Sequence, residues 1–235
     1  MINIILPMVG NSSRFFNDGY SRPKYELELG GKSLFERVLD GLLASTHDQI
    51  NFHFGVRSDF LGRKFVEQMM KRYNNVYSIL DFERATSGQA ATVFEILQKS
   101  NVRENIYIFN IDTILVNYKL SDFSGCAGGL DLFQADGNHW SFAKLSDNGQ
   151  VTETAEKKRI SDHASTGMYF FDTFETYKTC FDNPNNFRDS NEKYVAPMYN
   201  SLILSGGIVG SRNINPDQII LVGTPSEYHK ARELF

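Results

Sequence analysis

The first half of the chain alternates short, continuous apolar runs with segments in which apolar residues recur at helical spacing. Continuous runs of this kind suit parallel strands that helices cover on both faces. The first run, residues 2–6, leads into the polar sequence Gly-Asn-Ser-Ser-Arg at 10–14. We predict strands at 2–6, 50–56, 76–80 and 105–112.

The segments between these runs have the pattern of amphipathic helices. Leu34, Val38 and Leu42 recur every four residues, and Ser33 before them is a favourable N-cap. Asp59 is the residue that we expect to cap the next helix. A strand–helix alternation of this kind predicts a mostly parallel sheet with helices on both faces, in which ligands bind beyond the carboxyl ends of the strands. The predicted helices occupy 33–45, the segment after 59, and 88–98.

From about residue 128 the pattern changes to strands that are joined by short turns. A turn at 147–149 separates two of them, which is typical of an antiparallel arrangement. We therefore predict one α/β domain over 1–235, a Rossmann-like three-layer α/β/α fold whose mostly parallel central sheet carries a small antiparallel part. The predicted strands here are 129–134, 140–145, 151–157, 166–172 and 218–222, with helices at 173–181, 194–205 and after Pro225, and a mobile loop at 182–193.

The composition narrows the class of protein. A chain of 235 residues with 41% hydrophobic and 22% charged residues is ordinary for a globular domain. A net charge of -4 argues against a nucleic-acid binder that relies on a broad basic face. No apolar segment approaches 18 residues, so we expect no membrane span. Cys126 and Cys180 form no CxxC pattern, which favours free thiols and a cytoplasmic location.

The polar residues that follow the first predicted strand carry the first candidate chemistry. Gly10 allows the main chain to approach a ligand closely. The hydroxyls of Ser12 and Ser13 and the N–H groups of the loop are hydrogen-bond donors for an anion. Arg14 can hold phosphate oxygens in a bidentate fork, while Lys24 offers a compact charge. The arrangement outlines a triphosphate site, although neither GxxxxGK[ST] nor GxGxxG is present. Solvated surface charges are the alternative interpretation of the two cations.

Taken in order, these residues form a pattern with Pro23-Lys24 and with Gly-Lys-Ser-Leu at 31–34. The pattern resembles the signature of the nucleotidyltransferases that activate phosphorylated metabolites, namely the sugar-1-phosphate nucleotidyltransferases and phosphocholine cytidylyltransferases, in their capsule-type branch. One departure is Ser12, where the signature has a second glycine. The resemblance implies that Arg14 and Lys24 are catalytic and that 1–127 is a nucleotide-binding half. It also implies nucleotide contacts from Pro7, Met8, Gly10, Asn11, Ser12, Ser13, Glu83, Gly88 and Gln89.

Segments further along the chain extend the resemblance. The sequence Phe-Asn-Ile-Asp at 109–112 implies that Asp112 is a magnesium ligand, with a strand cap as the alternative. The second half, 128–235, is implied to bind the acceptor. For Lys157, which lies beside Lys158 and Arg159, the alternative interpretation is a solvated basic patch. For Glu192 and Tyr194, the alternative is the acidic and aromatic start of a helix. The implied acceptor contacts are Glu156, Lys157, Glu192 and Tyr194.

A second departure concerns the metal. The family often carries an aspartate two residues before Gly-Thr-Pro as a further metal ligand, and Leu221 stands at that position. Asp112 then works with water and phosphate oxygens, or another carboxylate substitutes for the missing one. Asp217, Glu192 and Glu156 are the candidates that the sequence leaves open.

The resemblance implies a Mg²⁺-dependent transfer of a nucleoside monophosphate from a nucleoside triphosphate to a phosphorylated small metabolite, with release of pyrophosphate, for surface polysaccharide synthesis. Glu83 favours CTP slightly, because a carboxylate accepts hydrogen bonds and suits the amino group of cytosine. The acceptor is left open between sugar 1-phosphates, phosphocholine and similar metabolites. We expect no nucleic-acid or membrane partner, and a homo-oligomer is left open. The alternatives are a metal-dependent GT-A-type glycosyltransferase and a nucleotide-binding regulator without turnover.

Overall fold

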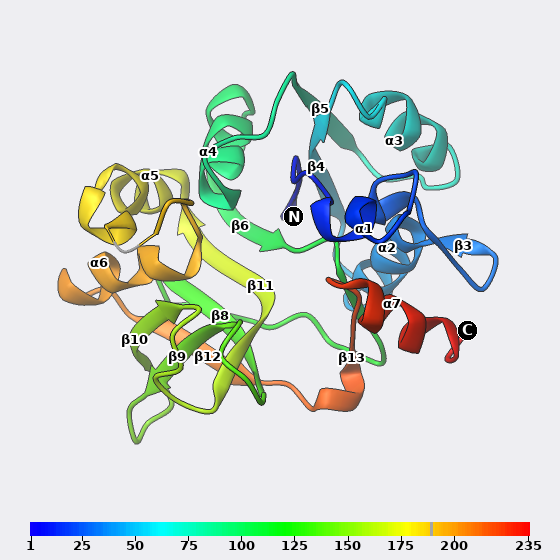
Figure 1. Ribbon diagram of the computed structural model, residues 1–235. Coiled ribbons are helices and arrows are strands. Elements are labelled where there is room, and N and C mark those ends of the chain that lie inside the picture. The colour runs from blue at the N-terminus through cyan, green and yellow to red at the C-terminus, as the bar shows by residue number, and fades with distance from the viewer. Residues whose placement is uncertain (189) are drawn as a thin grey trace.

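One mixed sheet of nine strands runs through the computed structural model, which describes residues 1–188 and 190–235 (Figure 1). Its main path has the order β10-β9-β11-β6-β1-β4-β5, and β8 pairs with both β11 and β12. The strands are β1 (Ile2–Met8), β4 (Ile50–Arg57), β5 (Tyr77–Phe82), β6 (Glu104–Phe109), β8 (Gly128–Gln134), β9 (Ser141–Leu145), β10 (Val151–Glu156), β11 (His163–Thr173) and β12 (Val209–Asn213).

The four strands that the first half contributes to this sheet are parallel, as the continuous apolar runs predict. β1 lies between β4 and β6, and β5 continues the sheet beyond β4. Ile4, Ile5 and Leu6 at its centre are fully buried, because helices cover both faces of this part of the sheet. The predicted α/β architecture with a mostly parallel core is confirmed.

Five strands of the second half, β8 to β12, extend this sheet rather than forming a separate one. β11 runs antiparallel to β6 and also pairs with β8 and β9. The sequence analysis missed β12, which pairs in parallel with β8. Its five residues end in the polar sequence Ser-Arg-Asn, so they show no apolar pattern from which a strand could be predicted.

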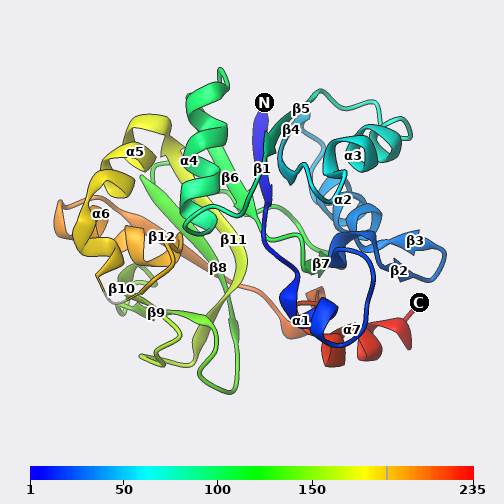
Figure 2. The same cartoon turned by 45° about the horizontal axis from the view of Figure 1, so that its top comes forward.

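Helices cover the sheet on both sides and give the predicted three layers (Figures 1 and 2). α2, α3 and α7 pack on one face, in a core that includes Leu34, Val66 and Tyr228. α4, α5 and α6 pack on the other face, where Val93 and Tyr177 belong to a second core. The helices are α1 (Ser13–Asn17), α2 (Leu34–Ala44), α3 (Gly62–Met70), α4 (Gln89–Lys99), α5 (Phe174–Asp182), α6 (Tyr199–Leu204) and α7 (Pro225–Arg232).

One of the two predicted helix caps is confirmed and the other is wrong. Ser33 caps α2, where its hydroxyl accepts from the Glu36 N–H at 3.3 Å and the Glu36 carboxylate accepts from the Ser33 N–H at 2.9 Å. Asp59 does not cap α3. The residue at the N-cap of this helix is Leu61, which has a left-handed backbone conformation. The Asp59 carboxylate instead pairs with Arg57 at 2.5 Å, because a guanidinium offers it stronger, charge-assisted hydrogen bonds.

Several short elements connect the larger ones. The C-terminal segment returns to the sheet through β13 (Ile219–Leu221), which pairs with β7 (Thr113–Leu115), and a hairpin joins β2 (Glu28–Leu29) to β3 (Lys32–Ser33). The predicted loop at 182–193 contains a 3₁₀ turn, and its residue 189 lies outside the described residues. The 3₁₀ turns are Lys24–Glu26, Pro184–Phe187, Ala196–Met198 and Pro216–Gln218.

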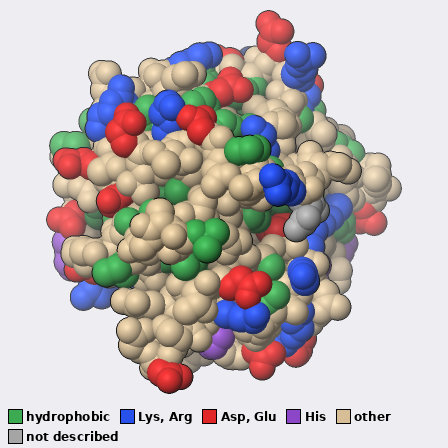
Figure 3. Space-filling view, turned by 90° about the vertical axis from the view of Figure 1, so that its left-hand side faces the viewer, with side chains coloured by type: hydrophobic (Ala, Val, Ile, Leu, Met, Phe, Trp, Pro, Cys, Tyr) green, Lys and Arg blue, Asp and Glu red, His purple; other side chains and the backbone are tan. Residues whose placement is uncertain are grey.

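The surface over α5 and α6 carries charges of both signs. Acidic and basic side chains are interspersed on this side of the molecule, as the Lys178–Asp182 ion pair on α5 illustrates (Figure 3). A nucleic-acid backbone is attracted by a patch of one sign, which this side does not offer. Among the described residues, no helix is long and apolar enough to cross a membrane.

Candidate active site

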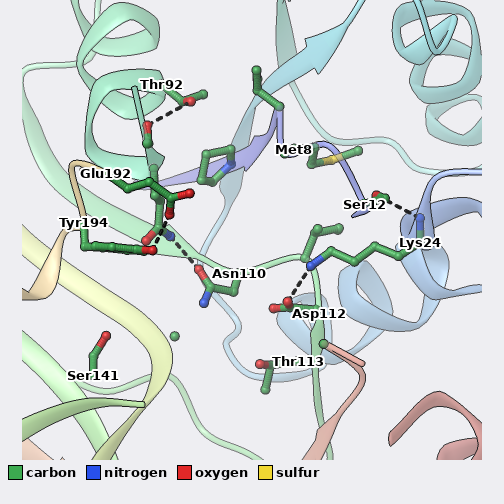
Figure 4. A pocket seen from close by; sticks show the side chains of 18 of the residues that line it. Met8, Ser12, Lys24, Thr92, Asn110, Asp112, Thr113, Ser141, Glu192 and Tyr194 are labelled. Atoms are coloured by element: carbon green, nitrogen blue, oxygen red, sulfur yellow. Dashed lines mark hydrogen bonds and ion pairs between the residues drawn. The ribbon is translucent and has the colours of Figure 1, made fainter. Parts of the chain in front are cut away.

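A cleft of about 470 Å³ lies beyond the carboxyl ends of β1 and β6 (Figure 4). This is the edge at which parallel α/β sheets bind their ligands. Most of the predicted site residues line the cleft, whereas Ser13, Glu83 and Lys157 do not. The predicted residues in its wall are Pro7, Met8, Gly10, Asn11, Ser12, Arg14, Lys24, Gly88, Gln89, Asp112, Glu156, Glu192 and Tyr194.

The loop after β1 forms one wall of the cleft. Ser12 takes the left-handed conformation with φ 51°, and its hydroxyl accepts a hydrogen bond from the Lys24 N–H at 3.2 Å. The serine that departs from the family signature therefore ties this loop to the Pro23-Lys24 segment. A Cβ on Gly10 would meet nothing within 4 Å, so protein packing does not require a glycine there. Close approach of a ligand to the main chain at Gly10 stays a prediction.

Lys24 and Asp112 meet at the centre of the cleft. The Lys24 ammonium lies 2.5 Å from Asp112 Oδ2, and the two side chains are 23% and 25% exposed. Arg14 lies nearby, exposed, with its guanidinium 3.5 Å from the Gly223 carbonyl oxygen. β6 ends three residues before Asp112, at Phe109, and Asp112 directly precedes β7. Two cations and a carboxylate from distant parts of the chain thus face one space.

Contacts with the start of α4 and with β11 fix the loop that carries Asp112. Asn110 accepts a hydrogen bond from the Gln89 amide at 2.5 Å, and its N–H donates to the Gly167 carbonyl at 3.2 Å. A Cβ on Gly167 would lie 2.6 Å from Asn110 Nδ2, so only glycine allows this approach. Thr113 donates to the Thr166 carbonyl at 3.1 Å. The sequence analysis assigned no role to Asn110 or Gly167, whose partners become visible only in the fold.

The segment at the start of α4 is joined to the segment around Lys193. The Lys193 N–H donates to the Ser87 carbonyl at 2.7 Å, and the Ala90 N–H donates to the Lys193 carbonyl at 2.8 Å. Gly88 has a φ of 136°, and a Cβ there would lie 2.5 Å from the Lys193 nitrogen. The predicted nucleotide contacts Gly88 and Gln89 therefore share one wall with the segment that carries Glu192 and Tyr194.

Glu83 does not belong to this wall. Its side chain is exposed and lines an adjoining depression formed by residues 81–87, Ala91 and Glu95. The prediction that Glu83 contacts the nucleobase is at odds with this position, because the chain turns between β5 and Gly88. The argument that its carboxylate favours CTP therefore loses its basis.

The opposite end of the cleft holds the predicted acceptor residues (Figure 4). Glu156 accepts a hydrogen bond from the Ser141 hydroxyl, and burial raises the pKa of its carboxyl against the opposing effects of Ser141 and Lys157. Tyr194 donates to Glu192. Lys157 lies behind Tyr194, with its ammonium 2.5 Å from the phenol oxygen. Lys157 thus reaches the cleft only through Tyr194.

Trp140, His139 and Tyr169 complete this end of the cleft. The Tyr169 hydroxyl donates to Ser141 Oγ at 3.3 Å, and the Trp140 indole donates to the Asp136 carbonyl at 2.9 Å. The sequence analysis left Trp140 and His139 without a role, because a single aromatic or histidine carries no spacing signal.

Comparison with known proteins assigns the chain to a family, although no family model matches it. It is 36% identical to the nucleoside-diphosphate-sugar pyrophosphorylase of Vibrio cholerae RC9, whose crystal structure superposes with a TM-score of 0.90 over 98% of this chain and 99% of that one. The chain belongs to the nucleoside-diphosphate-sugar pyrophosphorylase family. Members of this family are nucleotidyltransferases, as the signature around Lys24 implies.

The chain is also similar to more distant proteins. The inositol-1-phosphate CTP transferase of T. maritima is 12% identical, with a TM-score of 0.76 over 99% of this chain and 95% of that one. The bifunctional protein GlmU of Clostridium novyi (strain NT) is 25% identical over 227 residues. This match covers 90% of the present chain, which spans about half of that protein, 48% of its length.

The cleft offers a cation few protein ligands. Within the described residues, no group of three or more His, Cys, Asp and Glu side chains is arranged to hold a metal ion. Magnesium suits such a site, since it keeps several waters and binds through one or two carboxylates together with substrate phosphates.

Proposed function

We propose that this chain transfers a nucleoside monophosphate from a nucleoside triphosphate to the phosphate group of a small metabolite. A phosphate oxygen of the acceptor attacks the α-phosphorus and forms a new P–O bond. The bond from the α-phosphorus to the bridging oxygen breaks, and pyrophosphate leaves with the electron pair. The observation that carries this proposal is the meeting of Lys24, Asp112 and Arg14 in one cleft at the carboxyl edge of the sheet.

The attacking group is already an anion, so the reaction needs no strong general base. Its barrier comes from bringing two polyanions together and from the charge on the α-phosphoryl oxygens, so positioning and electrostatics carry it. Lys24 lies deep in the cleft and would neutralise the α-phosphate and the incoming phosphate. Arg14 lies at the exposed rim and would hold the β- and γ-phosphates.

Magnesium fits the donors of the cleft. Asp112 presents a carboxylate whose oxygen already binds a cation, the Lys24 ammonium. Asp112 would hold the magnesium ion, which would supply further neutralisation of the triphosphate. Lys24 then exchanges Asp112 for phosphate oxygens when the nucleotide binds.

A sugar 1-phosphate is the acceptor that we propose. The far end of the cleft presents the carboxylates of Glu156 and Glu192 and the hydroxyls of Ser141 and Tyr169, which can bind several sugar hydroxyls. Phosphocholine is the second candidate, because Trp140 could stack against its quaternary ammonium group. An activated sugar is what a glycosyltransferase consumes, so we assign the product to surface polysaccharide synthesis.

CTP is the nucleotide that we propose to test first. Glu83 lies outside the cleft, whereas Gln89 lines it and can contact the base. The Gln89 amide nitrogen donates to Asn110, which leaves its carbonyl oxygen to accept from an exocyclic amino group such as that of cytosine.

A matrix of the four NTPs and dTTP against phosphorylated acceptors, read by pyrophosphate release, tests the function. We expect release from one nucleotide–acceptor pair and a loss of about a hundredfold or more in Lys24→Ala. Lys32→Ala is the matched control, because Lys32 is exposed and pairs with Asp40 away from the cleft. A chain that binds nucleotide but releases no pyrophosphate with any pair is a regulator, and one that consumes a nucleoside-diphosphate sugar is a glycosyltransferase.

A further inference from the structure

Four carboxylates line the cleft, and they differ in their partners. Asp112 pairs with Lys24, Glu156 accepts from Ser141, and Glu192 accepts from Tyr194. For Glu227, no hydrogen bond or ion pair of the carboxylate exists within residues 1–188 and 190–235, and only its backbone N–H is engaged. This carboxylate is therefore available to a ligand of the cleft.

The backbone around Glu227 holds it close to Asp112. The Val222 N–H donates to the Asp112 carbonyl at 2.8 Å, which joins the end of β13 to the loop after β6. Thr224 then caps α7, and its hydroxyl accepts from the Glu227 N–H at 3.2 Å. In a capping box, the Glu227 carboxylate would accept a hydrogen bond from the Thr224 N–H. It does not do so here, and lies instead close to Gly223.

Gly223 leaves a space between the two carboxylates. A Cβ on this residue would lie 3.2 Å from Asp112 Oδ2 and 3.5 Å from Glu227 Oε2, so both oxygens border the same point. A side chain at Gly223 would fill this space. Leu221 also lines the cleft. The resemblance places a carboxylate at this position, but leucine has only a hydrocarbon side chain.

We propose that Glu227 is the second protein carboxylate of the magnesium site, opposite Asp112 across Gly223. This inference rests on the proposed function. Lys24 and Asp112 together are neutral, so Glu227 supplies the additional negative charge that attracts a divalent cation. Oxygen donors of two carboxylates, completed by water and phosphate, form the ligand set that magnesium prefers. Glu227 replaces Asp217, Glu192 and Glu156 as the residue that compensates for Leu221.

Direct binding of Mn²⁺, followed by the electron paramagnetic resonance signal of the free ion, tests the assignment. The probe is Mn²⁺ alone and Mn²⁺ with an α,β-methylene analogue of the NTP. We expect the Kd for Mn²⁺ to rise at least about tenfold in Glu227→Gln and further in Asp112→Asn. Glu233→Gln is the control, because Glu233 is exposed beyond the end of α7. An unchanged Kd in Glu227→Gln, or a weakened Kd in Asp217→Asn instead, overturns the proposal.

Two further variants separate metal binding from folding. Glu227→Asp keeps the charge at a shorter reach, and we expect its Kd to lie between those of wild type and Glu227→Gln. Leu221→Asp, added to Glu227→Gln, places a carboxylate elsewhere in the same wall, and we expect it to recover Mn²⁺ binding. Equal Kd values in Glu227→Asp and Glu227→Gln would contradict a role for the charge. If wild type binds Mn²⁺ through Glu227 yet releases no pyrophosphate, the proposed function fails while the metal assignment stands.

Discussion

Replacement of Gly88 by alanine tests the idea that one wall serves both substrates. Gly88 has φ 136° and ψ 176°, a backbone conformation that is essentially restricted to glycine. A Cβ on Gly88 would also lie 2.5 Å from the nitrogen and 2.6 Å from the oxygen of Lys193. Both atoms are backbone, so the segment around Lys193 has to move.

The cost follows from these two effects. The backbone strain of an L-residue in this conformation is about 1–3 kcal/mol. Moving Lys193 breaks its hydrogen bonds to Ser87 and Ala90, each of which contributes about 1 kcal/mol. We therefore expect Gly88→Ala to lower the free energy of unfolding by about 3–5 kcal/mol.

Urea unfolding measures this loss, and Gly149→Ala provides the matched control. Gly149 also has a positive φ, 80°, but a Cβ there meets nothing within 4 Å, so only the strain of about 1–2 kcal/mol remains. In the pyrophosphate assay, Gly88→Ala raises the KM for the nucleotide and for the acceptor together, because Glu192 and Tyr194 move with Lys193. Equal losses of stability in the two variants, or a change in the nucleotide KM alone, would refute this reasoning.

Three further outcomes follow from single side chains. Ser12→Gly removes a serine in a left-handed conformation and its hydrogen bond to Lys24. We expect the protein to become up to about 1 kcal/mol more stable in thermal unfolding, while pyrophosphate release slows. Faster pyrophosphate release would contradict a role of the Ser12–Lys24 hydrogen bond in positioning Lys24. Burial raises the pKa of the Asp131 carboxyl from 3.8 to about 6, so the folded state holds this proton to higher pH and loses about 3 kcal/mol of stability as pH rises from about 4 to about 6. Urea unfolding at pH 4 to 7 should show this loss in wild type and not in Asp131→Asn; parallel profiles refute it. We expect Lys157→Ala to raise the KM for the acceptor and to leave the KM for the nucleotide unchanged. Lys158→Ala is the control, because Lys158 is exposed. Equal effects of the two variants would indicate that Lys157 is part of a solvated patch.

The parts of the fold that depend on local pattern could be predicted from the sequence. Continuous apolar runs indicate β1, β4 and β6, because the buried parts of these strands have no polar side to show. β5 could be predicted from a similar run, although part of this strand is exposed. The cap at Ser33 could be predicted because its partner Glu36 is only three residues away. The cap at Asp59 could not, since its competing partner Arg57 is held in place by a hydrogen bond to Asn11 at 2.7 Å, which only the fold brings close.

The candidate site divides in the same way. The spacing of Arg14, Lys24 and Asp112 could be read in order along the chain, and all three line one cleft. Glu83 is only five residues before Gly88, but the turn between them carries its side chain to another surface. Glu227 was missed because it comes close to Asp112 only through the pairing of β7 with β13.

Transfer of the α-phosphorus of the nucleotide is the measurement that tests the central claim most directly. With an NTP labelled with ³²P at the α-position and a phosphorylated acceptor, the account predicts that label moves into a nucleoside-diphosphate-linked product, with one pyrophosphate released for each product. The rate should fall by about a hundredfold or more in Lys24→Ala and stay unchanged in Lys32→Ala. Label that remains in the NTP with every acceptor, or a Lys24→Ala variant as fast as wild type, would contradict the account.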